Sequence, residues 1–140
     1  MLYVIPDDAG RITQANKIFE PTPEYEGQLR DVGHRFVTDP TKMIVSPDDW
    51  WVHKEKLRKR PSLSVLAPRR TIKAGGSERA VLHGVPKAAL VTLTMDGVML
   101  YQGTPGETLC EFALPVPGLY RFAVDLWPAR LFVAEFEAVA

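Results

Sequence analysis

The chain has 140 residues, 46% of them apolar, and its 17 basic and 17 acidic residues give a formal net charge of zero at pH 7. This length suits one domain or two small ones, and the apolar fraction is ordinary for a globular protein. The balanced charge excludes the strong overall basicity with which dedicated nucleic-acid-binding proteins attract a polyanion.

The charges are segregated along the chain, although they cancel in total. Residues 1–50 carry nine acids and five bases, residues 51–73 one acid and eight bases, and residues 74–140 seven acids and four bases. The net charges of these blocks are therefore −4, +7 and −3. A basic band between two acidic blocks predicts contact between unlike patches, either within one chain or between neighbouring copies.

Cysteine usage and hydropathy bear on the compartment. Cys110 is the only cysteine, so no internal disulfide can form, which fits assembly in a reducing cytoplasm. The first residues lack the basic region and the long apolar run of a secretory leader, and we expect none. No apolar run approaches the ~20 residues that span a bilayer, so we expect no membrane partner.

The first half of the chain contains several short runs of strand type. Residues 2–5 and 11–15 are joined by a turn of Pro, Asp and Gly, which predicts a β-hairpin. Residues 35–38 and 43–45 read as two further short strands, separated by an Asp-Pro pair. This part of the chain is therefore expected to contain a small sheet.

One helix is predicted between these strands. Thr22 suits the N-cap and Pro23 the first helical position, because the N–H that proline lacks has no helical partner there. Tyr25, Leu29 and Val32 then form a single apolar stripe, and a glycine at position 33 ends the helix. The N-terminal module is thus expected to be of α+β type.

A second hairpin is predicted where the basic band begins. Residues 50–52 and 57–59 can pair across residues 53–56. Adjacent residues of a strand point to opposite faces, so one of Trp50 and Trp51 should face the core and the other the surface or a partner. We expect the apolar residues to pack and the charged tip to face an acidic patch. The candidate partner-binding residues here are Trp50, Trp51, Lys54, Lys56 and Arg58.

A proline-bracketed segment divides the chain. Residues 61–68, PSLSVLAP, have no helical period and are expected to be extended and ordered. The predicted organisation is an α+β docking module over residues 1–61, a linker over residues 62–68 and a second domain over residues 69–140.

The second domain has the pattern of a β-sandwich. Seven strand-like runs with alternating apolar residues follow one another in about seventy residues, with turn signals between them. The clearest turn is Asp96-Gly97, a two-residue hairpin signal. The runs are residues 71–73, 79–85, 90–95, 98–101, 108–114, 119–126 and 131–139. The fold class is accordingly mainly β.

The sixth predicted run of the second domain begins at Gly118-Leu119-Tyr120. This motif resembles the Gly-x-Tyr at the start of the sixth strand of immunoglobulin-like sandwiches, where the tyrosine forms a corner motif. Phe122 stands where the second cysteine of antibody domains is expected. The resemblance is therefore to microbial members without a disulfide.

Four segments along the chain have a recognisable pattern and order, namely the opening segment YVIPDDAGRITQA, the aromatic segment WWVHKEKLRKRP, and the closing segments GVPKAALVTLTMDG and VPGLYRFAVDLWP. In these segments the chain resembles small virion proteins of tailed bacteriophages, mostly tail-associated ones. The resemblance is one of pattern and order over most of the chain. It implies a structural or host-contact role and transfers no catalytic residues.

Motifs for catalysis or cofactor binding are not recognisable in the sequence. His34, His53 and His83 are not spaced as metal ligands, and no phosphate-binding loop or nucleophile elbow occurs. Cys110 lies in an alternating strand, where a small buried hydrophobe is expected rather than a thiolate nucleophile. The paired aspartates at residues 7–8 and 48–49 read as turn acids that bond their own backbone. We expect no enzyme activity, metal or cofactor.

The end of one predicted strand offers a further contact surface. Trp127 and Arg130 are of residue types favoured at interfaces, and they are candidates for a subunit or receptor contact. The predicted function is that of a non-enzymatic virion structural protein, and its expected partners are other virion proteins and further copies of the chain. It would be assembled in the host cytoplasm. The alternatives are a carbohydrate-binding module that uses Trp127 or Tyr101, and a nucleic-acid-binding accessory protein that uses residues 54–60.

Overall fold

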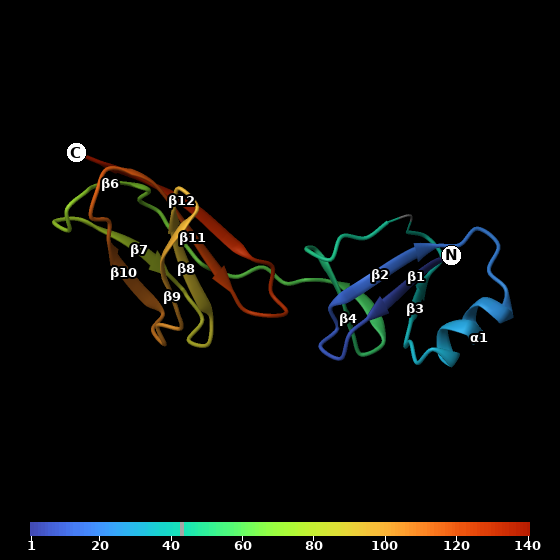
Figure 1. Cartoon of the computed structure of the whole chain (residues 1–140). Helices are drawn as coiled ribbons and strands as arrows, with labels where there is room; N and C mark the ends of the chain where they lie inside the picture. The colour runs from blue at the N-terminus through green and yellow to red at the C-terminus, as the bar shows by residue number, and fades with distance from the viewer. Residues whose placement is uncertain (43) are drawn as a thin grey trace. The chain divides into compact units, whose positions relative to one another are not determined.

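The computed structural model describes residues 1–42 and 44–140 (Figure 1). The chain forms two compact units, Met1–Arg60 and Pro61–Ala140, and each is described by itself. Strands dominate both units, and the described residues contain a single short helix. The prediction of a mainly β protein is confirmed.

The first unit is built on a three-stranded sheet. The strand β1 (Leu2–Pro6) lies between β2 (Ile12–Lys17) and β3 (Val37–Asp39), and it is antiparallel to both. The predicted opening hairpin is confirmed as β1–β2. The strand predicted at residues 35–38 is found as β3, shifted toward Asp39, because its pairing with β1 selects the residues that extend.

The central strand β1 is buried on both of its faces. Leu2 and Val4 belong to one apolar cluster, which also contains Val52 of the second hairpin. Tyr3 and Ile5 belong to another cluster, which contains Leu29 of the helix. All five residues of β1 are buried. A strand that is covered on both faces has to be apolar throughout, as the run LYVIP is.

The helix α1 (Pro23–Asp31) covers one of these faces. Its N-terminus is capped by Thr22, whose Oγ1 accepts a hydrogen bond from the Tyr25 amide at 3.3 Å. Gly33 follows the helix with a φ of +82° and donates to the Arg30 carbonyl at 2.9 Å. The predicted start and end of the helix are both confirmed.

The prediction of a strand at residues 43–45 is wrong for residues 44 and 45. Met43 lies outside the described residues, and Ile44 and Val45 form no strand. Val45 is nevertheless buried in the cluster that contains Val52. Burial of one apolar residue in this segment is achieved without sheet pairing, so its apolar character gave a misleading signal.

The second hairpin is confirmed. Strands β4 (Trp50–His53) and β5 (Lys56–Lys59) pair antiparallel across a two-residue turn. The turn residues Lys54 and Glu55 have φ values of +51° and +60°. Positive φ at both turn residues is the conformation that matches the twist of two hairpin strands.

The second unit contains a five-stranded and a two-stranded sheet. The five-stranded sheet has the order β6-β12-β11-β8-β9, and the two-stranded sheet pairs β10 with β7. Neighbouring strands are antiparallel except for β12 and β6, which are parallel. The seven strands are β6 (Thr71–Lys73), β7 (Arg79–His83), β8 (Leu90–Met95), β9 (Val98–Gly103), β10 (Leu109–Ala113), β11 (Gly118–Asp125) and β12 (Phe132–Val139).

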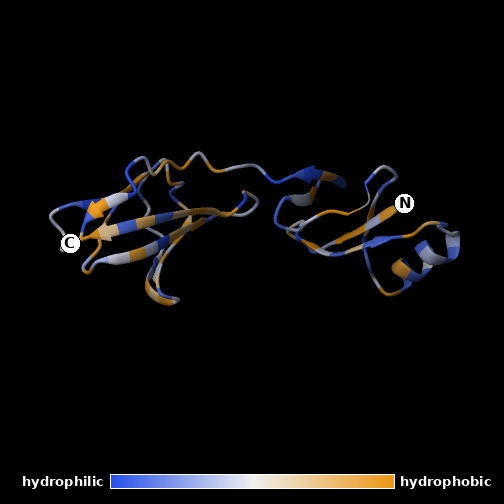
Figure 2. Cartoon of the chain, turned by 90° about the horizontal axis from the view of Figure 1, so that it is seen from above, coloured by the Kyte–Doolittle hydropathy of each residue, from blue (hydrophilic) through white to orange (hydrophobic). Residues whose placement is uncertain are grey.

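Both sheets contribute to one apolar core. Leu82 and Cys110 of the small sheet share a buried cluster with Val91 and Phe122 of the large sheet. The Phe122 ring lies 5.0 Å from the Phe112 ring of β10, measured between centroids. Figure 2 shows hydrophobic and hydrophilic residues alternating along the strands of this unit, as expected when one face is buried. The seven predicted strands are all found.

Residues 62–68, predicted as a linker, form part of the second unit. Val65 and Ala67 are buried in its core, and Leu66 between them pairs with His83 of β7 through backbone hydrogen bonds of 2.9 and 2.8 Å. The segment is extended, as expected. Its alternate apolar residues allow one face to be buried, so it continues the fold instead of separating two domains.

Candidate interaction surface

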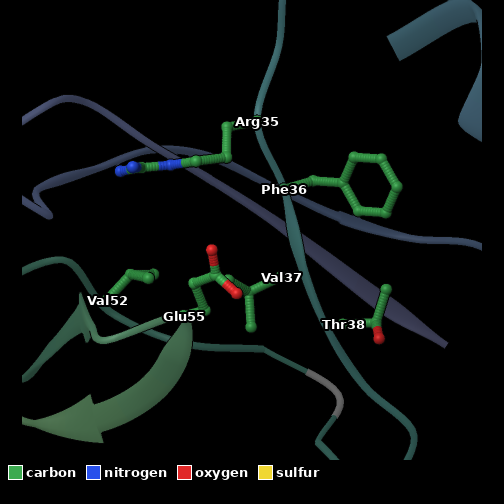
Figure 3. A pocket seen from close by; sticks show the side chains of 6 residues that line it. All are labelled: Arg35, Phe36, Val37, Thr38, Val52 and Glu55. Carbon is green, nitrogen blue, oxygen red and sulfur yellow. The ribbon is translucent and has the colours of Figure 1, made fainter. Parts of the chain in front are cut away.

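A depression of about 340 Å³ lies beside β3 and the second hairpin. Figure 3 shows the Arg35 guanidinium and the Glu55 carboxylate on one side of β3, with the Phe36 ring turned away from them. Nη2 of Arg35 donates to the Asp7 carbonyl at 3.2 Å, so this cation is already used in the fold. The depression is near the lower size limit of small-molecule sites.

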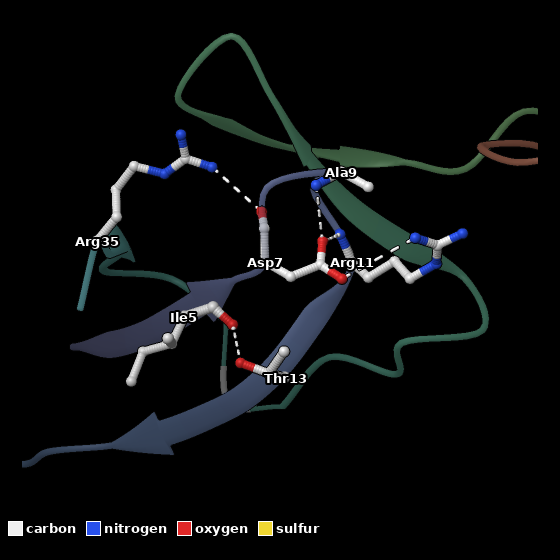
Figure 4. Close-up of polar contacts among 6 residues, drawn as sticks. All are labelled: Ile5, Asp7, Ala9, Arg11, Thr13 and Arg35. Atoms are coloured by element: carbon white, nitrogen blue, oxygen red, sulfur yellow. Dashed lines mark hydrogen bonds and ion pairs between the residues drawn. The ribbon is translucent and has the colours of Figure 1, made fainter. Parts of the chain in front are cut away.

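The turn between β1 and β2 is fixed by Asp7. Its Oδ1 accepts hydrogen bonds from the backbone amides of Ala9 at 2.9 Å and Arg11 at 2.8 Å (Figure 4). The other carboxylate oxygen lies 4.0 Å from Nη1 of Arg11. This is the local bonding that was predicted for a turn acid. These hydrogen bonds fix the conformation of the turn, which contacts the strand β4.

The second hairpin is attached to this turn through Gly10. The Val52 amide donates to the Gly10 carbonyl at 2.9 Å. Gly10 has a φ of +87°, and a Cβ added there would lie 2.1 Å from the Val52 carbonyl oxygen. Only glycine can therefore let the turn and β4 approach so closely. The turn and the interior of the first unit together hold the hairpin in place.

The inner face of the hairpin packs on the core. Trp50, Val52 and Leu57 all belong to the apolar cluster around Leu2 and Val4 or pack against it. The Trp50 ring is also covered by cations, with Nζ of Lys42 at 4.8 Å and Nζ of Lys59 at 5.7 Å from its centroid. Trp50 is therefore a structural residue of the first unit.

The outer hairpin face consists of Trp51, His53, Lys56 and Arg58. Trp51 is paired with Arg58 and His53 with Lys56, so the four side chains share one face. The rings of Trp51 and His53 are stacked, with centroids 4.6 Å apart and planes 15° from parallel. Two stacked aromatic rings on β4 thus share one face of the hairpin with two cations on the paired strand β5.

The cations of this hairpin are exposed and not neutralised within the described chain. Lys54, Lys56 and Arg58 are all exposed, and no ion pair of theirs is found among the described residues. Glu55 at the tip is the single acid of residues 50–60. A surface of this charge attracts an anionic partner.

Trp127 and Arg130 lie in the turn between β11 and β12 of the second unit. The peptide bond between Trp127 and Pro128 is cis, and the Ala129 amide donates to the Leu126 carbonyl at 2.8 Å. Arg130 is exposed, and its backbone amide donates to the Pro61 carbonyl at 2.7 Å. Trp127 is half-buried. These two candidates belong to one turn, and the hairpin candidates belong to the other unit.

The cysteine and the carboxylates are held by contacts within the fold. Cys110 is buried, and burial together with the nearby Glu107 carboxylate raises the pKa of its thiol. The hydroxyl and amide of Thr41 donate to Asp39 and lower the pKa of that carboxyl to about 2. Among the described residues, no three His, Cys, Asp or Glu side chains are grouped as they would be around a metal ion. The described helix is not long or apolar enough to cross a membrane.

Sequence reasoning identified most of the outer hairpin face but missed His53. The structure places Trp51, Lys56 and Arg58 together, puts Lys54 in the turn, and sends Trp50 to the opposite face. The two-residue period of a strand would have placed His53 beside Trp51. Comparison of the chain with protein-family models, curated proteins and solved structures found no match. Function has to be inferred from sequence and geometry.

Proposed function

We propose that this chain is a non-enzymatic structural protein of a bacteriophage virion, associated with the tail and present in multiple copies. Its first unit docks on the particle through the outer hairpin face, and its second unit is an immunoglobulin-like module that projects from or bridges other virion proteins. The proposal is supported by the phage-like order of segments and by the exposed cations and stacked aromatic rings of the outer hairpin face.

The immunoglobulin-like assignment is supported by three features of the second unit. Its two sheets have an immunoglobulin-type strand order if β7 and β10 are taken as strands B and E, with β8, β11 and β12 as C, F and G. The Tyr120 hydroxyl donates to the Val116 carbonyl at 2.7 Å and accepts from the Val116 amide at 3.2 Å. This is the bonding of a tyrosine corner. Phe122 is fully buried at the position of the missing cysteine.

A single observation carries the docking proposal, namely the exposed cations beside a stacked aromatic pair on a rigidly held hairpin. Lys56 and Arg58 lie opposite the Trp51–His53 pair, and the hairpin is fixed through Val52. A preformed surface loses little conformational entropy on binding. The partner best matched to it is an acidic protein surface with apolar area for the aromatic rings.

The docking proposal is tested by co-sedimentation with the phage particle whose genome encodes the chain. We expect wild-type protein to sediment with particles that lack it, and the double variant Lys56→Glu and Arg58→Glu to lose at least about 10-fold in affinity. The matched control is Lys73→Glu with Lys87→Glu, which makes the same charge change at exposed residues of the second unit. Equal binding by both variants, or no binding by the wild type, would refute the proposal.

Nucleic-acid binding by the same face is the second candidate. The observation in its favour is the combination of aromatic rings and cations, which in other proteins stack bases and contact phosphates. The mutual stacking of Trp51 and His53 argues against it, because each ring already covers one face of the other. A salt titration with a single-stranded oligonucleotide decides: a linear fall of log affinity with log salt favours this candidate, and no measurable binding removes it.

A further inference from the structure

The strand β9 lies at the edge of the five-stranded sheet with β8 as its neighbour. The backbone groups of an edge strand that point away from its neighbour are available for pairing with another strand. Four consecutive apolar side chains of β9 are exposed, in fractions of 60, 55, 48 and 36% for Val98, Met99, Leu100 and Tyr101. The strand therefore presents both apolar surface and backbone pairing groups.

The sequence around β9 is also free of charge. From Gly97 to Gly106 there is no acidic or basic residue, although Asp96 and Glu107 lie directly outside this range. Charged residues on an edge strand are one means by which proteins prevent edge-to-edge pairing. Their absence leaves β9 without that protection.

The other exposed strands of the second unit differ from β9 in this respect. The opposite edge of the large sheet is β6, which has three residues and carries Lys73, with Arg69 and Arg70 directly before it. In the small sheet β10 has Glu111 at its centre, and β7 pairs with Leu66. Among the described strands of this unit, β9 is thus the long edge without a charge.

We propose that β9 is a self-association site, at which the β9 strands of two copies of this chain pair antiparallel across a two-fold axis. This inference rests on the proposed multi-copy function and names the surface through which copies meet. Because β9 is uncharged, self-pairing places no like charges opposite each other. An axis near Leu100 would bring Met99 of one copy opposite Tyr101 of the other, whose ring also contacts Phe112 of its own chain at 5.3 Å between centroids. It would also place Asp96 opposite Thr104, so the flanking acids do not meet.

A β-bulge in β9 limits the expected affinity of the contact between two β9 strands. The pairing of β9 with β8 passes from Tyr101 opposite Leu93 to Met99 opposite Thr94, and it leaves Leu100 without a partner on β8. A bulge shortens the regular ladder that a second strand can join. Six residues of paired strand also bury less than the ~1,200 Å² of a standard interface. We therefore expect a dimer with a dissociation constant on the order of 10–100 µM, which the local concentration within an assembly would populate.

The test is analytical ultracentrifugation of the full chain from about 1 µM to 1 mM. We expect the wild type to dimerise over this range, and Leu100→Lys and Leu100→Glu each to be monomeric, because a two-fold contact sets like charges against each other. An equimolar mixture of these two variants should recover association. The matched control is Leu119→Lys, which lies 62% exposed on β11 between two paired strands and should dimerise as the wild type does.

Hydrogen exchange provides a second readout that does not depend on a substitution. The amides of residues 98–103 that point away from β8 should exchange more slowly at high concentration than at low concentration. A wild type that stays monomeric at 1 mM, a Leu100→Lys variant that dimerises normally, or a mixture without recovery would each overturn the inference. Docking is measured separately, so monomeric protein that still sediments with particles would overturn self-association alone. Dimeric protein that does not sediment would overturn docking alone.

Discussion

Replacing Gly10 by alanine should destabilise the first unit strongly. A left-handed backbone at an L-residue costs about 1–2 kcal/mol, and the φ of Gly10 is +87°. The added Cβ would lie 2.1 Å from the Val52 carbonyl oxygen, so the turn and β4 have to move apart. That movement weakens the 2.9 Å hydrogen bond between the Val52 amide and the Gly10 carbonyl, which is worth about 1 kcal/mol.

The sum is a loss of about 2–3 kcal/mol in the free energy of unfolding, before any loss of packing at Val52. A unit of this size is stable by only about 3–9 kcal/mol, so much of that stability is removed. Urea denaturation measures the loss of stability, and hydrogen exchange shows which unit has lost it. Amides of β1 and β4 should lose protection in the variant, while those of β11 and β12 should keep it.

The matched control is Gly27→Ala in the helix α1. Within the described residues an added Cβ at Gly27 meets nothing within 4 Å, and alanine favours a helix over glycine by about 0.5–1 kcal/mol. Gly27→Ala should therefore stabilise the same unit slightly. If Gly10→Ala unfolds within 0.5 kcal/mol of the wild type, the hairpin does not depend on the close approach at Gly10 and the reasoning is refuted.

Three further predictions concern buried or bonded polar groups. Asp39 has a folded pKa of about 2, below its unfolded value, so its carboxylate contributes stability above about pH 4 that is lost as the pH falls through 2. In denaturation measured as a function of pH, the variant Asp39→Asn should lose about 1 kcal/mol of this acid-dependent stability. The figure is reduced because 20% of the Asp39 side chain is exposed to solvent. Native Cys110 should react with a thiol reagent on the order of 100-fold more slowly than unfolded protein, whereas equal rates would contradict its burial. Tyr120→Phe leaves the Val116 amide and carbonyl without their partner and should cost about 1–3 kcal/mol in urea denaturation, with Tyr101→Phe near neutral as its control.

The sequence was informative wherever a strand alternates strictly. Tyr120, Phe122 and Val124 are apolar at every second position, and all three are buried, so strand and inward face could both be predicted. The two-residue turn at Asp96-Gly97 was predictable for a different reason, since glycine and aspartate tolerate the positive φ values of +76° and +50° found there. In these elements local chemistry and tertiary packing favour the same structure.

Prediction from sequence failed where a tertiary contact determines which residues are buried. Val65 and Ala67 are buried because Leu66 pairs with His83, a partner seventeen residues away that the segment itself does not indicate. The alternation at Trp50 and Trp51 predicted opposite faces but not which one is internal. That choice is made by Val52, because its amide bonds to Gly10 and its side chain joins the core, which turns Trp50 inward with it.

The basic band of residues 51–73 is divided between the two units, and its parts have different physical consequences. Lys54, Lys56 and Arg58 lie on the hairpin of the first unit, where they form an exposed basic surface. Arg69 at the other end of the band is paired with Glu78 at 2.7 Å, whereas Arg70 and Lys73 place charge at the edge strand β6, which disfavours pairing at that edge. One charged segment can thus attract a partner at one end and protect a sheet edge at the other. Because β9 lacks such charges, the pairing of copies that we propose would be directed to this edge of the large sheet.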